Sequence, residues 1–436
     1  MFPEYIAKAV PRQPASRKPW YANTAPTYAG VFLWIGFYQS IASGTLNRSG
    51  LPLSLLGLAL AALISYGLFY YAPAMLGMKT GLPLYVVGSS TFGAKGGYLI
   101  PGLLMGALQV GWFGVSANLA SSFLLRAMDL PVTAGSMPVV IVNVLWGFII
   151  AAIAALGINY VARVALLVNV IPLVMILTVF FRTHSGFGHY TAAEASPWAG
   201  FTLLLQIVTG FFATAGAAGA DFGMENRNEK DVRLGGLVGI GAAILFAGGL
   251  PLIAMAGAHA THPELASYDF DALIGVVGGT LSQAIFVLYA VASIPGACFC
   301  AFIMGNSFST MLPRLRRTSV ILAGSSVAIV MSCTGVSSHL VPFFQIIGAS
   351  FGPVCGAMLA DYLVSGRRWA GPRQGVNLPG YAAWLGGFLV GIVPFLPGSQ
   401  SWKVYFEPAA VYSAVAGFLI YWVLSKCGLD SKPLAA

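Results

Sequence analysis

The stretch Gly36-Phe37-Tyr38-Gln39-Ser40-Ile41-Ala42-Ser43-Gly44 decides how this chain folds, because it has a counterpart far along the sequence. In the counterpart, Gly210-Phe211-Phe212-Ala213-Thr214-Ala215-Gly216-Ala217-Ala218-Gly219, a glycine, a phenylalanine, an aromatic residue and a hydroxyl residue recur in the same order and at the same spacing. Glycine-interrupted helices at matching positions of two halves indicate broken helices around a substrate site at the bilayer midplane. The alternative is that these glycines only let helices pack closely.

Apolar sequence extends outward from both stretches over the whole chain. Of the 436 residues, 58% are hydrophobic and 8% are charged, whereas a soluble domain carries about 25% charged residues. A spanning helix needs roughly 20 mostly apolar residues, so we predict an all-α polytopic membrane protein with about twelve transmembrane helices. The expected spans are 27–47, 52–76, 98–125, 136–157, 163–181, 200–220, 234–258, 278–305, 318–334, 341–364, 380–397 and 408–425.

The two matching stretches lie in the first and sixth predicted spans, so each begins a set of five helices. Because five is odd, the second set lies inverted in the membrane relative to the first. The expected layout is a cytoplasmic tail over 1–26, a transmembrane domain over 27–425 and a second cytoplasmic tail over 426–436. Within the domain, the segments are repeat one (about 27–181), repeat two (about 200–364) and two extra helices (about 380–425).

Basic residues gather on one side of these spans. With the N-terminus inside, the opposite loops hold only Arg48, Arg126, Arg182 and Lys403, which leaves 18 of the 22 Lys and Arg residues on the cytoplasmic side. This positive-inside asymmetry predicts a multi-pass protein of the plasma (inner) membrane with both termini in the cytoplasm. Topology thereby accounts for the net charge of +9, so the expected macromolecular environment is the lipid bilayer and not nucleic acid.

The sequence carries no pattern typical of an enzyme. It has no Cys/His metal-ligand spacing, no phosphate-binding loop and no Ser/His/Asp set that could converge. Cys298 and Cys300 stand two residues apart and point to different helix faces, which favours small buried hydrophobes over ligands. We therefore expect no catalytic residue, no metal and no cofactor, and the sequence sets no oligomeric state.

The polar residues inside the spans are uncharged, and this restricts the substrate. A charge within the bilayer is costly and usually functional, so the absence of Asp, Glu, Lys, Arg and His deep in the spans predicts a neutral solute. Most polar candidates are expected to bond between helices. They are Gln39, Gln109, Asn118, Asn143, Asn169, Gln206, Thr214, Gln283, Ser293, Asn306 and Gln345.

Gln109 stands out because it lies in Gln109-Val110-Gly111-Trp112-Phe113-Gly114. Its amide offers a donor and an acceptor together, and Trp112, one turn further on, offers a flat indole surface. This pair suits a planar heterocycle that has its own donor–acceptor edge. The alternative is a packed tryptophan beside a helix-bridging glutamine.

At these residues the sequence resembles the nucleobase:cation symporter-1 family, which comprises the cytosine, purine, hydantoin and allantoin permeases. The resemblance runs along nearly the whole chain, and Gln109–Gly114 is closest to the third helix of the cytosine permeases. The other matching motifs are Met78-Lys79-Thr80-Gly81-Leu82, Phe92-Gly93-Ala94-Lys95-Gly96, Ala220-Asp221-Phe222, Gly352-Pro353 and Ala360-Asp361-Tyr362.

The resemblance implies a LeuT-like fold, a five-plus-five inverted repeat with two extra C-terminal helices. It also implies cation-coupled import of a neutral nucleobase or related planar heterocycle by alternating access. Gln109 would bond the base and Trp112 would stack on it. The remaining substrate-binding candidates are Phe37, Phe212, Thr214, Gln39, Phe211 and Ser293.

The chain departs from the family on the eighth helix, where members carry one or two asparagines. Here the stretch is Ala292-Ser293-Ile294-Pro295-Gly296, and Phe211 stands where cytosine permeases have a serine. Sodium-coupled members place adjacent hydroxyl residues earlier on this helix, where this chain has Phe286-Val287-Leu288. The coupling cation therefore stays open between a proton and sodium. The rival functions are an amino-acid or other small-solute transporter of the same fold, a channel-like facilitator and a membrane enzyme.

Overall fold

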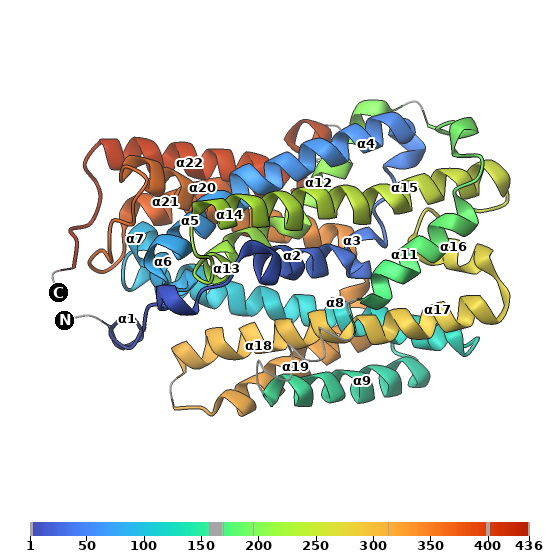
Figure 1. The fold of residues 1–436 in the computed structure, drawn as a ribbon, viewed down its shortest axis with the longest axis horizontal. Coiled ribbons are helices and arrows are strands. Elements are labelled where there is room, and N and C mark those ends of the chain that lie inside the picture. Colours follow the sequence, from blue (N-terminus) through green and yellow to red (C-terminus); the bar gives the residue numbers. More distant parts are fainter. Residues whose placement is uncertain are drawn as a thin grey trace.

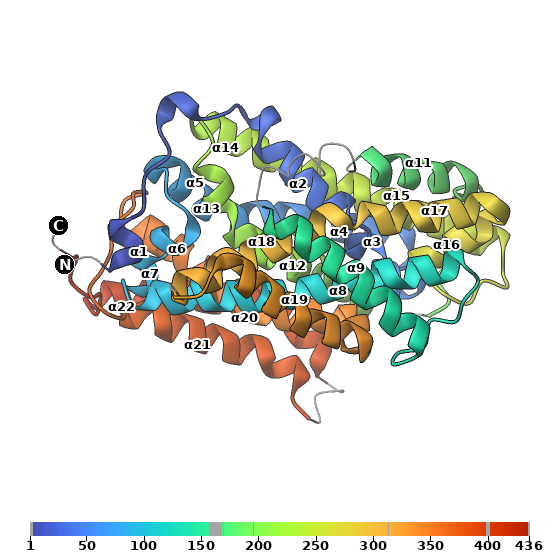
Figure 2. The same cartoon turned by 90° about the horizontal axis from the view of Figure 1, so that it is seen from below.

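Helices form almost all of the regular structure in the computed structural model. It describes residues 3–156, 168, 170–194, 196–312, 314–397 and 402–434, and within these ranges there is no β-strand beyond isolated bridges. Most of the helices run side by side along the long axis, as two perpendicular views show (Figures 1 and 2). Both termini lie at the same end of the molecule (Figure 1), as an even number of crossings requires.

Nine helices of the described part are long and apolar enough to cross a membrane. They are Leu46–Thr80 (α4, η3 and α5), Tyr98–Ala127 (η4 and α8), Met137–Ala155 (α9), Pro197–Ala217 (α12), Glu229–Thr261 (α14, η6 and α15), Gly279–Phe308 (within α17 and α18), Pro342–Val364 (in α20), Leu378–Phe395 (α21 and η8) and Ala409–Lys426 (α22). Two shorter apolar helices are α11 (Val170–Thr183) and α19 (Arg317–Cys333).

The first predicted span is an interrupted helix, formed by α2 (Thr24–Leu33) and α3 (Ile35–Tyr38). In the described ranges, the nine long and two shorter helices match eleven of the twelve predicted spans, and α2 with α3 lies at the position of the remaining one. Part of the fifth predicted span, 163–167 and 169, lies outside the described residues, as does the candidate Asn169. The prediction of an all-α polytopic fold is confirmed.

The interruption of the first helix lies at Trp34, whose ψ of 130° is extended and not helical. A second departure from helical backbone follows at Gly44, with φ +71°, before α4 begins at Leu46. The sequence-based expectation of a broken first helix is therefore correct.

The expectation that the sixth helix is also broken within its glycine motif is wrong. Helix α12 continues without interruption from Pro197 to Ala217, and only a turn at Ala218 separates it from α13 (Gly219–Gly223). The physical reason lies in packing: a Cβ at Gly210 would meet the Phe344 carbonyl oxygen of α20 (Leu340–Val364) at 2.5 Å. This glycine lets two helix backbones approach each other, which is the packing alternative.

A buried ion pair joins several segments at the end that carries the termini. Arg373 donates to an Asp361 carboxylate oxygen at 3.0 Å, and both side chains are nearly inaccessible to solvent. The same carboxylate accepts hydrogen bonds from Ser90 (2.6 Å), Thr91 (2.9 Å) and Tyr421 (2.9 Å). The network therefore holds α7 (Ser89–Phe92), α20 and α22 together and satisfies a charge that would be costly to bury alone.

Candidate functional site

Aromatic rings from four helices meet beside the break in the first helix. The Trp112 ring of α8 (Leu104–Ala127) lies 5.0 Å from the Phe211 ring of α12 and 5.2 Å from the Phe344 ring of α20, centroid to centroid. Phe37 of α3 contacts Phe211 at 5.1 Å, and Trp34 contacts Trp112 at 5.7 Å. We call these five residues, Trp34, Phe37, Trp112, Phe211 and Phe344, the central cluster.

Trp34 reaches the cluster because the backbone turns at this residue and because Gly36 follows it. A Cβ on Gly36 would lie 2.4 Å from two carbon atoms of the Trp34 ring, so only glycine leaves room for the indole to lie back over its own chain. The sequence-based reasoning missed Trp34, although its place two residues before the Gly36 motif was a usable signal. It also missed Phe344, for which no sequence signal exists.

Three buried polar atoms of the segment around this break have no hydrogen-bond partner among the described residues. They are the indole Nε1 of Trp34, a donor, the hydroxyl of Tyr38, and the amide Oε1 of Gln39, an acceptor. A buried polar group left unpaired costs on the order of 1–3 kcal/mol, so each such group calls for an explanation. Trp34 Nε1 is thus a donor and Gln39 Oε1 an acceptor that no described residue satisfies.

Gln109 lies one turn before Trp112 on α8, and both side chains are buried, with 6% of each exposed. Residues three apart on a helix share a face, as the sequence-based prediction requires. The Gln109 Nε2 donates to the Met105 sulfur at 3.5 Å, and a thioether is a weak acceptor. The amide of Gln109 is thus held in place by a bond that a stronger acceptor could replace.

The remaining predicted site residues differ in how they relate to the cluster. Phe212 is fully buried but is not part of the central cluster. Its ring stacks on the Phe32 ring, with 5.4 Å between the ring centroids. Thr214 is buried on α12, three residues after Phe211 and so on the same face. Ser293 lies at the junction of α17 (Gly279–Ala292) and α18 (Ile294–Met311), where its hydroxyl donates to the Ala290 carbonyl at 2.7 Å.

Among the residues that the structure describes, the charged side chains lie at the two ends of the molecule and not around the central cluster. At the end away from the termini, Asp271 of α16 (Phe270–Val277) pairs with Arg126 at 2.7 Å. The backbone N–H of Phe270 donates to the Gln39 carbonyl at 2.7 Å, so α16 is tied to both the first and the third spanning helices. Among the described residues, no three His, Cys, Asp or Glu side chains converge as a metal site would require.

At the end carrying the termini, Asp221 lies in α13, beyond the spanning part of the sixth helix. Its carboxylate accepts from the Leu84 backbone N–H at 3.3 Å. Burial raises the pKa of Asp221 to about 6, since desolvation disfavours the charged form. Glu225, four residues later, pairs with Arg12 of the N-terminal segment at 3.0 Å.

An interrupted first helix in a polytopic helical fold, with a buried aromatic site and unpaired polar atoms beside the break, is the arrangement expected of a membrane transporter. The chain belongs to the family of permeases for cytosine/purines, uracil, thiamine and allantoin, whose profile matches residues 11–424. The resemblance seen in the sequence is thereby confirmed, and the family consists of permeases and not of enzymes.

Individual relatives and solved structures agree with this assignment. The cytosine permease of Escherichia coli strain K12 is 28% identical over 356 residues, which cover 79% of this chain and 76% of that protein. Among solved structures, the fold is similar to that of Mhp1, a nucleobase-cation-symport-1 family transporter, in a closed conformation with bromovinylhydantoin bound. That comparison has a TM-score of 0.69 and 18% identity, and it covers 97% of this chain and 96% of Mhp1.

A Na+-coupled sialic acid symporter in a substrate-bound outward-open state is also similar. Its TM-score is 0.61 at 12% identity, over 97% of this chain and 92% of the symporter. These two structural similarities concern the fold, and they confirm the predicted LeuT-like inverted-repeat architecture.

Proposed function

We propose that this permease imports a neutral nucleobase or related planar heterocycle by cation-coupled alternating access, and that the substrate binds at the central cluster. The observation that carries the proposal is the position of Trp112, which lies between rings of the first, sixth and tenth helices with the Gln109 amide on the same helix face. Relatives named cytosine permease and a structure of Mhp1 with bromovinylhydantoin bound support the substrate class.

In this proposal the indole of Trp112 stacks on the heterocycle, and the Gln109 amide exchanges its thioether contact for the donor–acceptor edge of the substrate. The unpaired Nε1 of Trp34 and Oε1 of Gln39 supply a further donor and acceptor. Phe37, Phe211, Phe212 and Thr214 form the walls. Ser293 already donates to a carbonyl, so its hydroxyl oxygen serves only as an acceptor.

For the coupling cation, we infer that a proton suffices and that sodium is not strictly required. The eighth helix carries Phe286-Val287-Leu288 where sodium-coupled members place hydroxyl groups. Burial raises the pKa of Asp221, at the end that carries the termini, to about 6, and a carboxyl group with a raised pKa is a candidate proton carrier.

For the location, we propose an inner membrane protein with both termini in the cytoplasm, with tails over 1–26 and 426–436 flanking the domain over 27–425. The basic residues assigned to the cytoplasmic side support this orientation. The shared end of the two termini supports an even number of crossings (Figure 1). Reporter fusions after residue 436 and between 224 and 228 should both report the cytoplasm; either one reporting the opposite side would contradict the orientation.

The decisive experiment is a thermal-shift screen of purified protein, followed by uptake into proteoliposomes. The panel contains pyrimidines, purines, hydantoins, allantoin, thiamine and, as the competing class, amino acids. We expect a heterocycle to raise the melting temperature and to accumulate against its gradient, with accumulation abolished by an uncoupler. A shift produced only by amino acids would favour the amino-acid transporter. Uptake that only equilibrates would favour a facilitator.

A further inference from the structure

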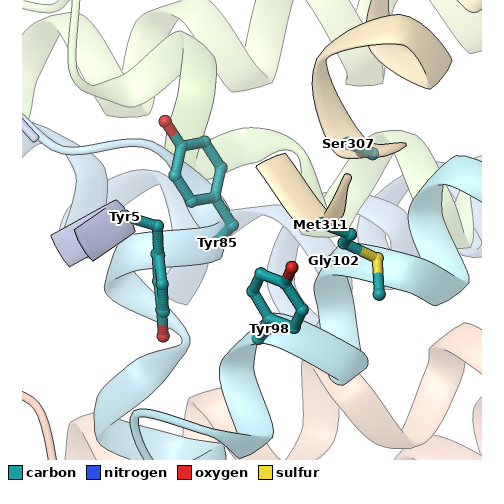
Figure 3. Close-up of a pocket in the computed structure, with 6 residues that line it drawn as sticks. All are labelled: Tyr5, Tyr85, Tyr98, Gly102, Ser307 and Met311. Carbon is teal, nitrogen blue, oxygen red and sulfur yellow. The ribbon is translucent and has the colours of Figure 1, made fainter. Parts of the chain in front are cut away.

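The last turns of α18 have two different neighbours at the end that carries both termini. On one side, Ser307 and Met311 stand opposite the side chains of Tyr5, Tyr85 and Tyr98 (Figure 3). The space that these residues enclose has room for about one water molecule. This side of α18 is therefore filled by the protein itself.

The opposite side of α18 carries Arg317, the first residue of α19. Phe302 and Gly305 lie about half a turn around the helix from Ser307 and Met311, since an α-helix has about 3.6 residues per turn. The guanidinium carbon of Arg317 lies 4.2 Å from the centroid of the Phe302 ring. Its Cγ lies 3.6 Å from a Cβ built on Gly305. Arg317 thus lies on the face of α18 that is turned away from the N-terminal segment.

Two nitrogen atoms of Arg317, Nε and Nη2, are shielded from solvent and yet have no hydrogen-bond acceptor among the described residues. No other basic side chain of the described ranges has buried nitrogen atoms in this condition. By contrast, Arg17 donates to a backbone carbonyl at 2.6 Å, and Arg373 pairs with Asp361 at 3.0 Å. The Phe302 ring stabilises the cation but leaves these N–H donors unpaired, which is costly for a charged group.

The sequence around Arg317 supplies no counter-charge. Arg314 and Arg316 precede it within three residues and are exposed, and positions 272 to 360 contain no Asp or Glu. None of the ion pairs in the described part of the chain includes any of these three arginines. We call Arg314, Arg316 and Arg317 the arginine cluster. It is a concentrated positive charge that the described residues do not neutralise.

Apolar side chains beside the arginine cluster are exposed, as at a boundary with lipid. Leu312 and Leu315 are 48% and 52% exposed, and Val327 and Val330 of α19 are 57% and 61% exposed. The membrane-crossing part of α18 ends at Phe308, and the connection from α18 to α19 lies at the end that carries the termini (Figure 1). The cluster therefore lies where the apolar core of the bilayer meets the phospholipid headgroups.

A phosphate group has the chemistry that the arginine cluster lacks. A guanidinium can donate two parallel hydrogen bonds to two phosphate oxygens. Because Arg317 as a whole is only half-buried, rotation about its side-chain bonds can bring its donors to the surface without moving α19. Basic clusters at the cytoplasmic end of a spanning helix attract anionic lipids. Phosphatidylglycerol has no cationic group beside its phosphate, whereas phosphatidylcholine has one.

We propose that the arginine cluster binds the phosphate of an anionic phospholipid of the cytoplasmic leaflet, and that Leu312 and Leu315 contact its acyl chains. The lipid supplies the acceptors that Nε and Nη2 of Arg317 lack. This site goes beyond the proposed function, because it does not depend on which substrate is transported. Only the choice of leaflet uses the proposed orientation.

The test uses the full chain, purified in a neutral detergent, and measures the melting temperature and the lipid retained in native mass spectrometry. Dioleoyl-phosphatidylglycerol is compared with dioleoyl-phosphatidylcholine, which has the same acyl chains, and with glycerol 3-phosphate, a soluble phosphate. We expect phosphatidylglycerol to be retained and to raise the melting temperature several degrees more than phosphatidylcholine does. Glycerol 3-phosphate should have little effect, because it lacks the acyl chains.

Replacing all three arginines of the cluster by glutamine should lower the affinity for phosphatidylglycerol roughly tenfold or more and remove its advantage over phosphatidylcholine. The matched control replaces Lys230, Arg368 and Lys426 by glutamine. These basic residues are exposed and assigned to the same side of the membrane, so the control removes the same charge and should keep most of the advantage. Arg317→Lys keeps the charge but loses the planar fork, so it should bind the lipid less tightly than wild type and more tightly than Arg317→Gln.

Three outcomes would overturn the lipid site. If Arg317 only packs on Phe302, Arg317→Gln would lower the melting temperature without lipid and keep the full advantage of phosphatidylglycerol. Equal effects of the two lipids on the wild type, or equal losses in the two triple variants, would show unspecific attraction of charge. A full effect of glycerol 3-phosphate would show a site for soluble phosphate. Heterocycle binding at the central cluster is measured without added lipid, so each of these outcomes leaves the proposed function standing.

Discussion

The first and sixth helices carry the same short motif and use it in different ways. Around Gly36 the helix breaks, and the glycine makes room for the indole of Trp34 on its own chain. Around Gly210 the helix continues, and the glycine makes room for the backbone of α20 at Phe344. In the first case the glycine shapes a candidate binding site, whereas in the second it fixes the distance between two helices.

The comparison teaches that matching residues in an inverted repeat predict equivalent positions but not equivalent backbones. Both motifs supply rings to the central cluster, Phe37 from one and Phe211 from the other, and these rings lie 5.1 Å apart. The break occurs only in the half where a large indole, Trp34, stands two residues before the motif and folds back over its own chain. If the two glycines have these different roles, substituting Gly210 should mainly lower stability, whereas substituting Gly36 should mainly lower affinity for the substrate.

The largest effect is expected for Gly210→Val. Its side chain would overlap the Phe344 carbonyl, which cannot move without shifting α20, and overpacking of this kind costs about 1–3 kcal/mol or more. We expect a strongly lowered melting temperature of the ligand-free protein in detergent. Gly241→Val, at a glycine with no atom within 4 Å of a built Cβ, is the control. Equal melting temperatures for the two variants would contradict the packing role of Gly210.

The second prediction concerns Trp112→Ala and Gln109→Leu. Base–aromatic stacking is worth about 1–3 kcal/mol in single-stranded nucleic acid binding, and 1.4 kcal/mol is a factor of about ten in affinity. We expect Trp112→Ala to weaken heterocycle binding roughly tenfold or more, and Gln109→Leu to lose affinity while the protein stays monodisperse. Trp198→Ala and Gln283→Leu, at exposed positions, should bind normally. A collapsed melting temperature with intact affinity would instead assign Trp112 and Gln109 to packing.

A smaller, more selective effect is expected for Gly36→Ala. The added Cβ meets an indole ring and not a backbone carbonyl, so the ring moves and the fold survives. Affinity should fall about threefold to fivefold, since displaced stacking costs less than lost stacking, while the melting temperature changes by no more than a few degrees. A loss of stability as large as that of Gly210→Val would remove the distinction between the two halves.

The fourth prediction tests Asp221, the carboxyl group that follows the sixth helix. Its raised pKa of about 6 means that the folded state holds a proton more tightly than the unfolded state. Stability is therefore greatest below the ordinary carboxyl pKa and falls as the pH rises through about 6. Asp221→Asn keeps an acceptor for the Leu84 N–H and removes the charge. It should raise the melting temperature by a few degrees at pH 8 and by much less at pH 5; a gain that does not change with pH would refute the assignment.

The smallest effect is expected for sodium. Because Phe286-Val287-Leu288 offers no hydroxyl ligand on the eighth helix, replacing sodium by choline at fixed pH and membrane potential should change uptake less than twofold. Uptake that vanishes in choline would show that sodium is required and would contradict this inference.

The sequence by itself determined the class of fold, its polytopic membrane character and the family. These properties follow from the lengths of apolar segments and the order of short motifs, which are set along the chain and need no knowledge of contacts. The same is true of Gln109 and Trp112 as a pair, because a spacing of three on a helix places two side chains on one face.

Only the tertiary structure decided what each glycine motif does and which rings complete the site. Whether a helix breaks at a glycine depends on what the missing Cβ faces, a folded-back indole at Gly36 or a neighbouring backbone at Gly210. Phe344 joins Trp112 across more than two hundred residues of sequence. Such contacts depend on the packing of whole helices, whose small residues set how closely they approach, and no local pattern in the sequence records them.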